Sequence, residues 1–247
     1  MLPRINDTVN YKMTIPSTGE EVSYRPYLVK EEKVMMLALE SGDPKMMLNT
    51  IANTIESCLV DYKDSVRKLA TFDIEYMFLQ IRSKSVGETI DVQLKCQGKD
   101  CTYKHEHTIK FDDIKAPEIK GGKAGNIIKI TDDVSLKMCY PSYQNLIAYT
   151  NINENASEGE GAVDAMFAAI AACIESILIG EDEKVDTSEY SFDDMKAFLE
   201  QFTSTQFTKL REFVSNIPEL AHKIEWKCPS CNTENKLTLK GTADFFQ

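Results

Sequence analysis

The sequence predicts an α+β fold in which two similar units of helices and β-hairpins are joined by a split, zinc-ribbon-like site of four cysteines. Two short cysteine loops lie far apart in the chain, and each is flanked by runs that alternate apolar and polar residues. Several short segments also recur in the same order in the two halves. These observations predict a first repeat at residues 1–116, a linker at 117–126 and a second repeat at 127–247.

The first repeat opens with a predicted β-hairpin. Residues 11–15 and 21–25 alternate apolar and polar side chains on either side of a turn that contains Gly19. Such alternation around a glycine turn is typical of two antiparallel strands.

Three helices are expected next. Residues 30–41 are rich in helix formers and end before Gly42, which suits a C-terminal cap. Asp43 and Pro44 supply an N-cap and a first helical residue for a second helix. Residues 71–81 form a third helix, capped by Thr71. The second helix should face the core with Met47, Leu48, Ile51, Ile55 and Leu59.

The two cysteine loops each have the pattern of a hairpin tip. Cys96 and Cys101 are separated by four residues in the first loop, and Cys228 and Cys231 enclose a Pro-Ser turn in the second. Two such turns supply the four thiolates that a tetrahedral zinc ion needs. We therefore predict a structural zinc site at Cys96, Cys101, Cys228 and Cys231, closed to water and substrate because protein fills every position.

The cysteine pattern is also compatible with three alternatives to a metal site. A thioredoxin-like redox pair belongs beside a βαβ pattern, whereas the residues after Cys231 continue as a strand. A structural disulfide needs an oxidising compartment, and no signal peptide is expected at the N-terminus. The third alternative is that the four residues are plain loop thiols. Within a metal site, His105 or His107 is an alternative ligand in place of Cys101, although strand positions of this kind are more often simply polar.

The two halves share short matching segments. Residues 51–60 match residues 170–179 with Ile, Ala, Ile, Glu, Ser and Leu in register, and residues 71–74 match 191–194. We interpret this as an internal duplication in which the zinc joins the two copies and the second copy adds a helix at 205–216. The alternative is that amphipathic helices resemble one another by chance.

The composition and the motifs argue against several classes of function. The net charge of −11 and the lack of clustered Lys and Arg argue against nucleic-acid binding. No apolar run has membrane-spanning length, so no membrane partner is expected. Cys58, Cys139 and Cys173 fit buried small hydrophobes. No histidine lies in a catalytic motif, and the sequence predicts no catalytic residue and no enzyme activity.

Several segments together resemble a known family. They are residues 16–20, 24–33, 39–41, 72–76 and 84–88, with Trp226, the second cysteine loop and the Phe245-Phe246 ending. The chain resembles the baseplate hub subunit family of T-even-like contractile-tailed bacteriophages. The resemblance implies a virion protein made in the host cytoplasm and placed in the central hub of the tail baseplate, where it contacts other hub proteins.

The expected function is therefore that of a structural or assembly subunit. Two alternatives stay open: an assembly factor absent from the mature virion, and a zinc-ribbon regulatory protein that binds nucleic acid. The adjacent Phe245 and Phe246 are further expected to help dock another hub subunit, because aromatic side chains are enriched at protein interfaces.

Overall fold

The computed structural model describes residues 9–119, 127–145, 160–180 and 182–241. The chain forms two compact units. Unit 1 comprises Met1–Val66, Phe72–Glu118 and Glu219–Gln247, and unit 2 comprises Arg67–Thr71 and Ile119–Pro218. Unit 1 is therefore assembled from both ends of the chain, and unit 2 is largely the segment between them.

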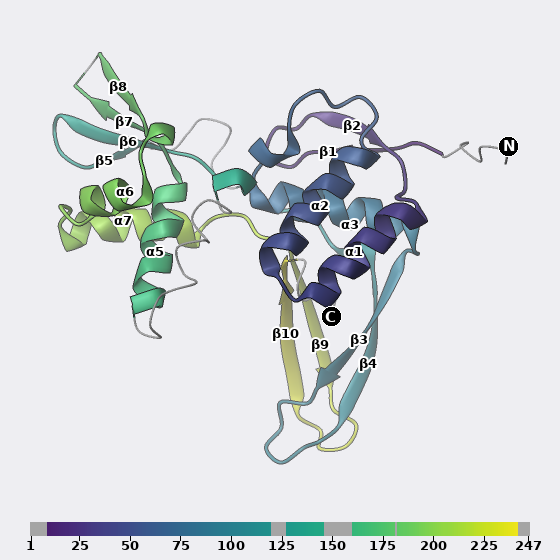
Figure 1. Ribbon diagram of the computed structural model, residues 1–247. Helices are drawn as coiled ribbons and strands as arrows, with labels where there is room; N and C mark the ends of the chain where they lie inside the picture. The colour runs from purple at the N-terminus through teal and green to yellow at the C-terminus, as the bar shows by residue number, and fades with distance from the viewer. Residues whose placement is uncertain (1–8, 120–126, 146–159, 181, 242–247) are drawn as a thin grey trace, which may run out of the picture. The chain divides into compact units, whose positions relative to one another are not determined.

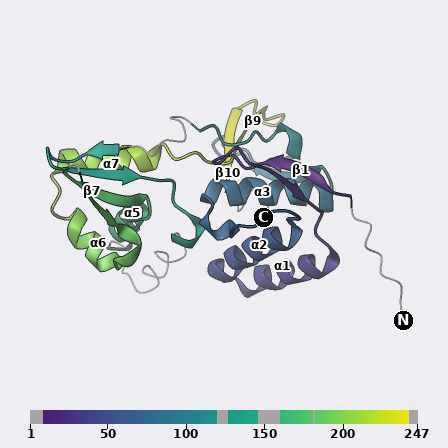
Figure 2. The same cartoon turned by 90° about the horizontal axis from the view of Figure 1, so that it is seen from above.

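Unit 1 begins with the predicted hairpin and helices. Strands β1 (Tyr11–Thr14) and β2 (Glu21–Tyr24) pair antiparallel. Helices α1 (Val29–Ser41), α2 (Pro44–Cys58) and α3 (Thr71–Ser85) follow, and Figure 2 shows them side by side in this order. The local signals are confirmed: Gly42 is left-handed at φ 67°, and the Asp43 carboxylate accepts a hydrogen bond from the Lys45 N–H at 2.8 Å.

Unit 1 also contains both cysteine hairpins. Strand β3 (Thr89–Lys95) pairs with β4 (Lys104–Lys110), and β9 (Ala221–Lys227) pairs with β10 (Glu234–Lys240). Figure 1 shows the two hairpins side by side, with their loops at the same end. Their inner faces share one core, whose buried members are Leu79, Leu94, Ile109, Phe111, Ile114, Leu220, Ile224 and Leu239.

The described part of unit 2 contains a four-stranded antiparallel sheet and the helices that pack with it. The strand order is β5 (Ile127–Lys129), β6 (Val134–Met138), β7 (Ile174–Ile179) and β8 (Glu183–Asp186). Helices α5 (Glu160–Ala172), α6 (Phe192–Leu199) and α7 (Ser204–Ser215) share a core with the sheet. A short 3₁₀ turn occupies Thr187–Glu189 in unit 2, another occupies Phe111–Asp113 in unit 1, and a third occupies Val66–Lys68, where the chain passes from unit 1 to unit 2.

The duplication rested on two matching segments, 51–60 and 170–179, that were both expected to be helical. The expectation is wrong for the second segment. Residues 51–58 are helical, but the matching segment leaves the helix at Ala172 and forms strand β7 from Ile174. Hydrogen bonds to β6 on one side and to β8 on the other hold this segment extended. Ile55 and Ile174 are both buried, yet they lie in different kinds of secondary structure, and the duplication is left without the helix match that suggested it.

The compact units also do not follow the predicted repeats. The second cysteine hairpin, expected in a repeat at 127–247, belongs to unit 1 together with the first. The reason is the shared apolar core: Ile224 and Leu239 pack with Leu94 and Ile109. The four cysteines thus join two hairpins of one unit rather than two copies of a repeat.

Some sequence predictions fall on residues outside the described ranges. These are most of the linker at 117–126 and the Phe245-Phe246 ending. Within the described ranges, no helix combines the length and the apolar character needed to cross a membrane.

Candidate metal centre

The cysteines occupy two closed loops. The Cys96 N–H donates to the Tyr103 carbonyl at 3.0 Å, and the Cys228 N–H donates to the Thr233 carbonyl at 2.9 Å. Each bond extends its strand ladder past the last paired residue. The first cysteine of each loop is therefore fixed directly on the end of a strand.

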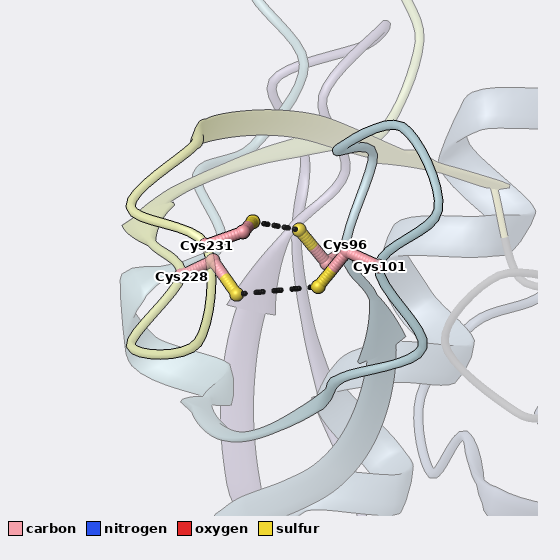
Figure 3. Close-up of side chains that lie close together, drawn as sticks. All are labelled: Cys96, Cys101, Cys228 and Cys231. Atoms are coloured by element: carbon pink, nitrogen blue, oxygen red, sulfur yellow. Dashed lines mark hydrogen bonds between the residues drawn. The ribbon is translucent and has the colours of Figure 1, made fainter.

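The four sulfur atoms converge on one point between the loops. Figure 3 shows Cys96 facing Cys231 and Cys101 facing Cys228, with sulfur separations of 3.5 Å and 3.8 Å. All four ligand atoms lie within 4.8 Å of one another. Zinc–sulfur bonds of about 2.3 Å set the edge of a tetrahedral site at about 3.8 Å. The two shortest sulfur separations therefore match the edge length of a tetrahedral zinc site.

The geometry differs from that of a disulfide. The four cysteines are free thiols, and the shortest of these contacts, 3.5 Å, is far longer than the bond of about 2.05 Å in a disulfide. The chain also continues from Cys231 into strand β10, as the sequence predicted, and not into the helix of a thioredoxin-like redox site.

Two residues with left-handed backbone shape the loops. Asp100, just before Cys101, has φ 61°, and Asn232, just after Cys231, has φ 59°. Asp and Asn tolerate this conformation better than other residues with a side chain. The loops turn sharply beside their second cysteines as a result, which directs both thiols toward the opposite hairpin.

Gly98 lets the two loops approach each other. A Cβ atom at this position would lie 2.8 Å from the Thr233 hydroxyl oxygen and 2.9 Å from the Cys231 sulfur. Any side chain at residue 98 would therefore push against the sulfur cluster. The sequence shows Gly98 as a turn residue, but its contact with the other loop depends on how the hairpins pack.

Asn235 ties the two hairpins together. Its side chain is 1% exposed, and its Oδ1 accepts a hydrogen bond of 2.7 Å from the Gln97 N–H in the opposite loop. Its Nδ2 donates to the Thr233 carbonyl at 3.0 Å. Sequence reasoning missed this residue. The available signal was a polar side chain on the inward face of a strand whose other inward positions are Leu237 and Leu239.

The thiols differ in acidity. Hydrogen bonds with the side chain and backbone of Thr233 lower the pKa of Cys231 to about 6. At Cys101 a backbone hydrogen bond from Tyr103 also acts to lower the pKa, but desolvation and the neighbouring thiols outweigh it and raise the pKa to about 12. A bound cation would deprotonate the remaining thiols, since metal coordination favours the thiolate. The cluster therefore offers four soft sulfur donors, the kind of ligand that a zinc ion binds.

His105 and His107, the alternative metal ligands, contact aromatic rings and are not part of the cysteine cluster. His105 stacks on Trp226 with ring centroids 5.4 Å apart, and His107 lies 5.7 Å from His105 by the same measure. Among the described residues, the candidate metal group consists of the four cysteines alone. Of the other cysteines, Cys58 and Cys173 are buried as predicted, and Cys139 is half-buried.

The fold and the site together define a mixed helix-and-strand protein with a four-cysteine cluster able to hold a metal. The family described as T4 bacteriophage base plate protein matches residues 8–247, and the chain belongs to this family. The predicted resemblance to phage baseplate proteins is thereby confirmed. Membership makes the chain a component of the phage tail baseplate that contacts other baseplate proteins. No curated protein and no solved structure matches the chain.

Proposed function

We propose that this baseplate protein is a non-enzymatic subunit of the central hub, that it works through protein contacts, and that a structural zinc ion stiffens it. Membership of the baseplate family supports the structural role. The observation that carries the metal is the convergence of four thiols from two hairpins that are more than a hundred residues apart in sequence. Four protein ligands leave no position for water or substrate, and such closed sites are structural.

The metal has a mechanical role in this proposal. A two-stranded hairpin alone is marginally stable in water, and each cysteine hairpin has one apolar face. The shared core holds the two faces together along the strands, and the metal would hold the loops together at the far end. The pair then behaves as one stiff arm that can present its polar outer faces to neighbouring subunits.

Zinc is the metal that this donor set favours. Four thiolates in a tetrahedron suit zinc or iron, and a hairpin scaffold with two short cysteine loops is typical of structural zinc sites. Metal analysis of purified protein distinguishes the two ions. An iron site would also be coloured, whereas zinc is not.

The hub assignment is tested during infection. A tagged chain is expected to co-purify with hub intermediates, and mass spectrometry should find it there. Replacing Cys228 with serine should reduce this co-purification, while the matched change at half-buried Cys139 in unit 2 should not. Recovery of the chain from other baseplate intermediates but not from hub intermediates would contradict the hub role.

The same material separates a subunit from an assembly factor. A subunit persists in purified tails at a fixed ratio to the other hub proteins, whereas an assembly factor is present in intermediates and missing from tails. A gel shift on duplex DNA that weakens with salt would instead favour the nucleic-acid-binding alternative, because phosphate contacts are salt-dependent.

A further inference from the structure

Helix α1 is oriented with much of its apolar surface outward. Its buried residues are Glu31 and Ala38. Among its exposed residues are Val29 at 78%, Leu39 at 63% and Met36 at 58%. A surface helix of a globular protein ordinarily turns its apolar side chains toward the core. This helix does the opposite, and Val34 and Leu37 are also exposed.

The orientation of α1 is fixed by polar contacts. The Glu31 carboxylate accepts hydrogen bonds from Arg25 Nη2 at 2.9 Å and from the Leu28 N–H at 2.8 Å. Rotating the helix to bury its apolar side chains would break these bonds and expose the small Ala38 contact with the core. Because unpairing a buried carboxylate is costly, α1 does not relieve its exposed surface by rolling over.

Two apolar and two charged residues form a stripe along the outward face of α1. Val29, Lys33, Met36 and Glu40 are spaced i, i+4, i+7 and i+11, so they line one side of the helix. Lys33 and Glu40 are both exposed, and neither forms an ion pair within the described part of the chain. The outward face thus carries apolar side chains together with the oppositely charged Lys33 and Glu40.

We propose that this face of α1 binds α1 of a second copy of the chain, in an antiparallel pair with twofold symmetry. A twofold axis between Met36 and Leu37 places Lys33 of each copy opposite Glu40 of the other. The two Met36 and two Leu37 side chains meet at the centre. A parallel pair would instead bring Lys33 to Lys33 and Glu40 to Glu40. The pattern is self-complementary, as a twofold interface requires.

The interface is small. Stable complexes bury roughly 1,200 Å² or more, and one helix of 13 residues from each copy supplies less than this. A dissociation constant in the micromolar range is therefore expected, so the dimer should dissociate as the protein is diluted. The high local concentration in a multi-subunit particle would favour the associated form.

Charge reversal tests the proposal directly. Sedimentation velocity of the whole chain, metal-loaded, is measured from roughly 1 to 100 μM, a span that brackets a micromolar dissociation constant. The wild-type chain should shift from monomer to dimer. Lys33→Glu and Glu40→Lys should each weaken the dimer about tenfold, because each turns two attractions into two repulsions. The double variant should recover the wild-type affinity.

Two more variants control for fold and charge. Lys63→Glu makes the same charge change at an exposed residue outside α1 and should leave the dimer intact. Met36→Glu should abolish the dimer while circular dichroism stays unchanged, since Met36 is exposed. A wild-type chain that stays monomeric, a dimer indifferent to Lys33→Glu, or a double variant that does not recover would each overturn the proposal.

Discussion

Replacing Asn235 with alanine should loosen the two cysteine hairpins. The change removes the acceptor of the Gln97 N–H, which donates at 2.7 Å across the hairpins. The Thr233 carbonyl also loses a donor but keeps the Cys228 N–H at 2.9 Å. The backbone N–H of Gln97 is therefore left without an acceptor. An unsatisfied buried donor costs about 1–3 kcal/mol, and we expect the lower part of this range because the Gln97 side chain is exposed and water can approach.

Trp226 provides the assay. It is the single tryptophan of the chain, and it packs against the shared core of the hairpins. Urea unfolding of the metal-loaded protein, followed by tryptophan fluorescence, therefore reports on this part of unit 1. Asn49→Ala is the control, because its Nδ2 makes an exposed bond to the Lys45 carbonyl. If Asn235→Ala lowers the free energy of unfolding by less than about 0.5 kcal/mol, the level of ordinary surface substitutions, the bridging role of Asn235 is refuted.

Three further changes test the fold and the site. Gly98→Ala should weaken metal binding, because its Cβ would meet the Cys231 sulfur at 2.9 Å. Competition with a chelator measures this, and unchanged affinity would contradict the close approach. Ile109→Ala should lower the free energy of unfolding in the fluorescence assay by about 2–5 kcal/mol, because Ile109 is 1% exposed and its truncation leaves a cavity. A decrease of less than about 1 kcal/mol would place Ile109 outside the core. Glu31→Gln tests pH dependence. Burial acts to raise the pKa of Glu31, but hydrogen bonds from Arg25 and the Leu28 backbone lower it overall. The wild-type advantage over Glu31→Gln should be full above the unfolded pKa of about 4.3 and should fade as the pH falls through the lower folded pKa. A pH-independent difference would argue against the charged pair.

Local signals in the sequence predicted much of unit 1. Gly42 and Asp43 mark the end of one helix and the start of the next because caps depend on a few neighbouring residues. The cysteine spacing predicted the four-cysteine cluster in part for a similar reason, because each short turn brings two cysteines close together. The meeting of the two turns depends on how the hairpins pack. The sequence did not reveal that α1 would bury Glu31, because that orientation depends on Arg25.

Strand β7 shows where local reasoning fails. Each of its faces mixes apolar residues with one polar residue, Ser176 on one face and Glu175 on the other. Neither a period of 3.6 nor a period of 2 is therefore distinct, and short runs of this kind are ambiguous between helix and strand. The pairing with β6 and β8 decides the outcome. The roles of Gly98 and Asn235 were hidden for a related reason, since each depends on contact between hairpins that are far apart in sequence.

Zinc content tests the central claim most directly. Native mass spectrometry of the purified chain should show about one zinc ion per chain, the ratio of a single closed site. Cys96→Ser and Cys228→Ser should each lose that ion, because the two residues lie on different hairpins and serve the same cluster. Full zinc in either variant, or a wild-type chain that binds no zinc when it is supplied, would contradict a shared four-cysteine metal centre.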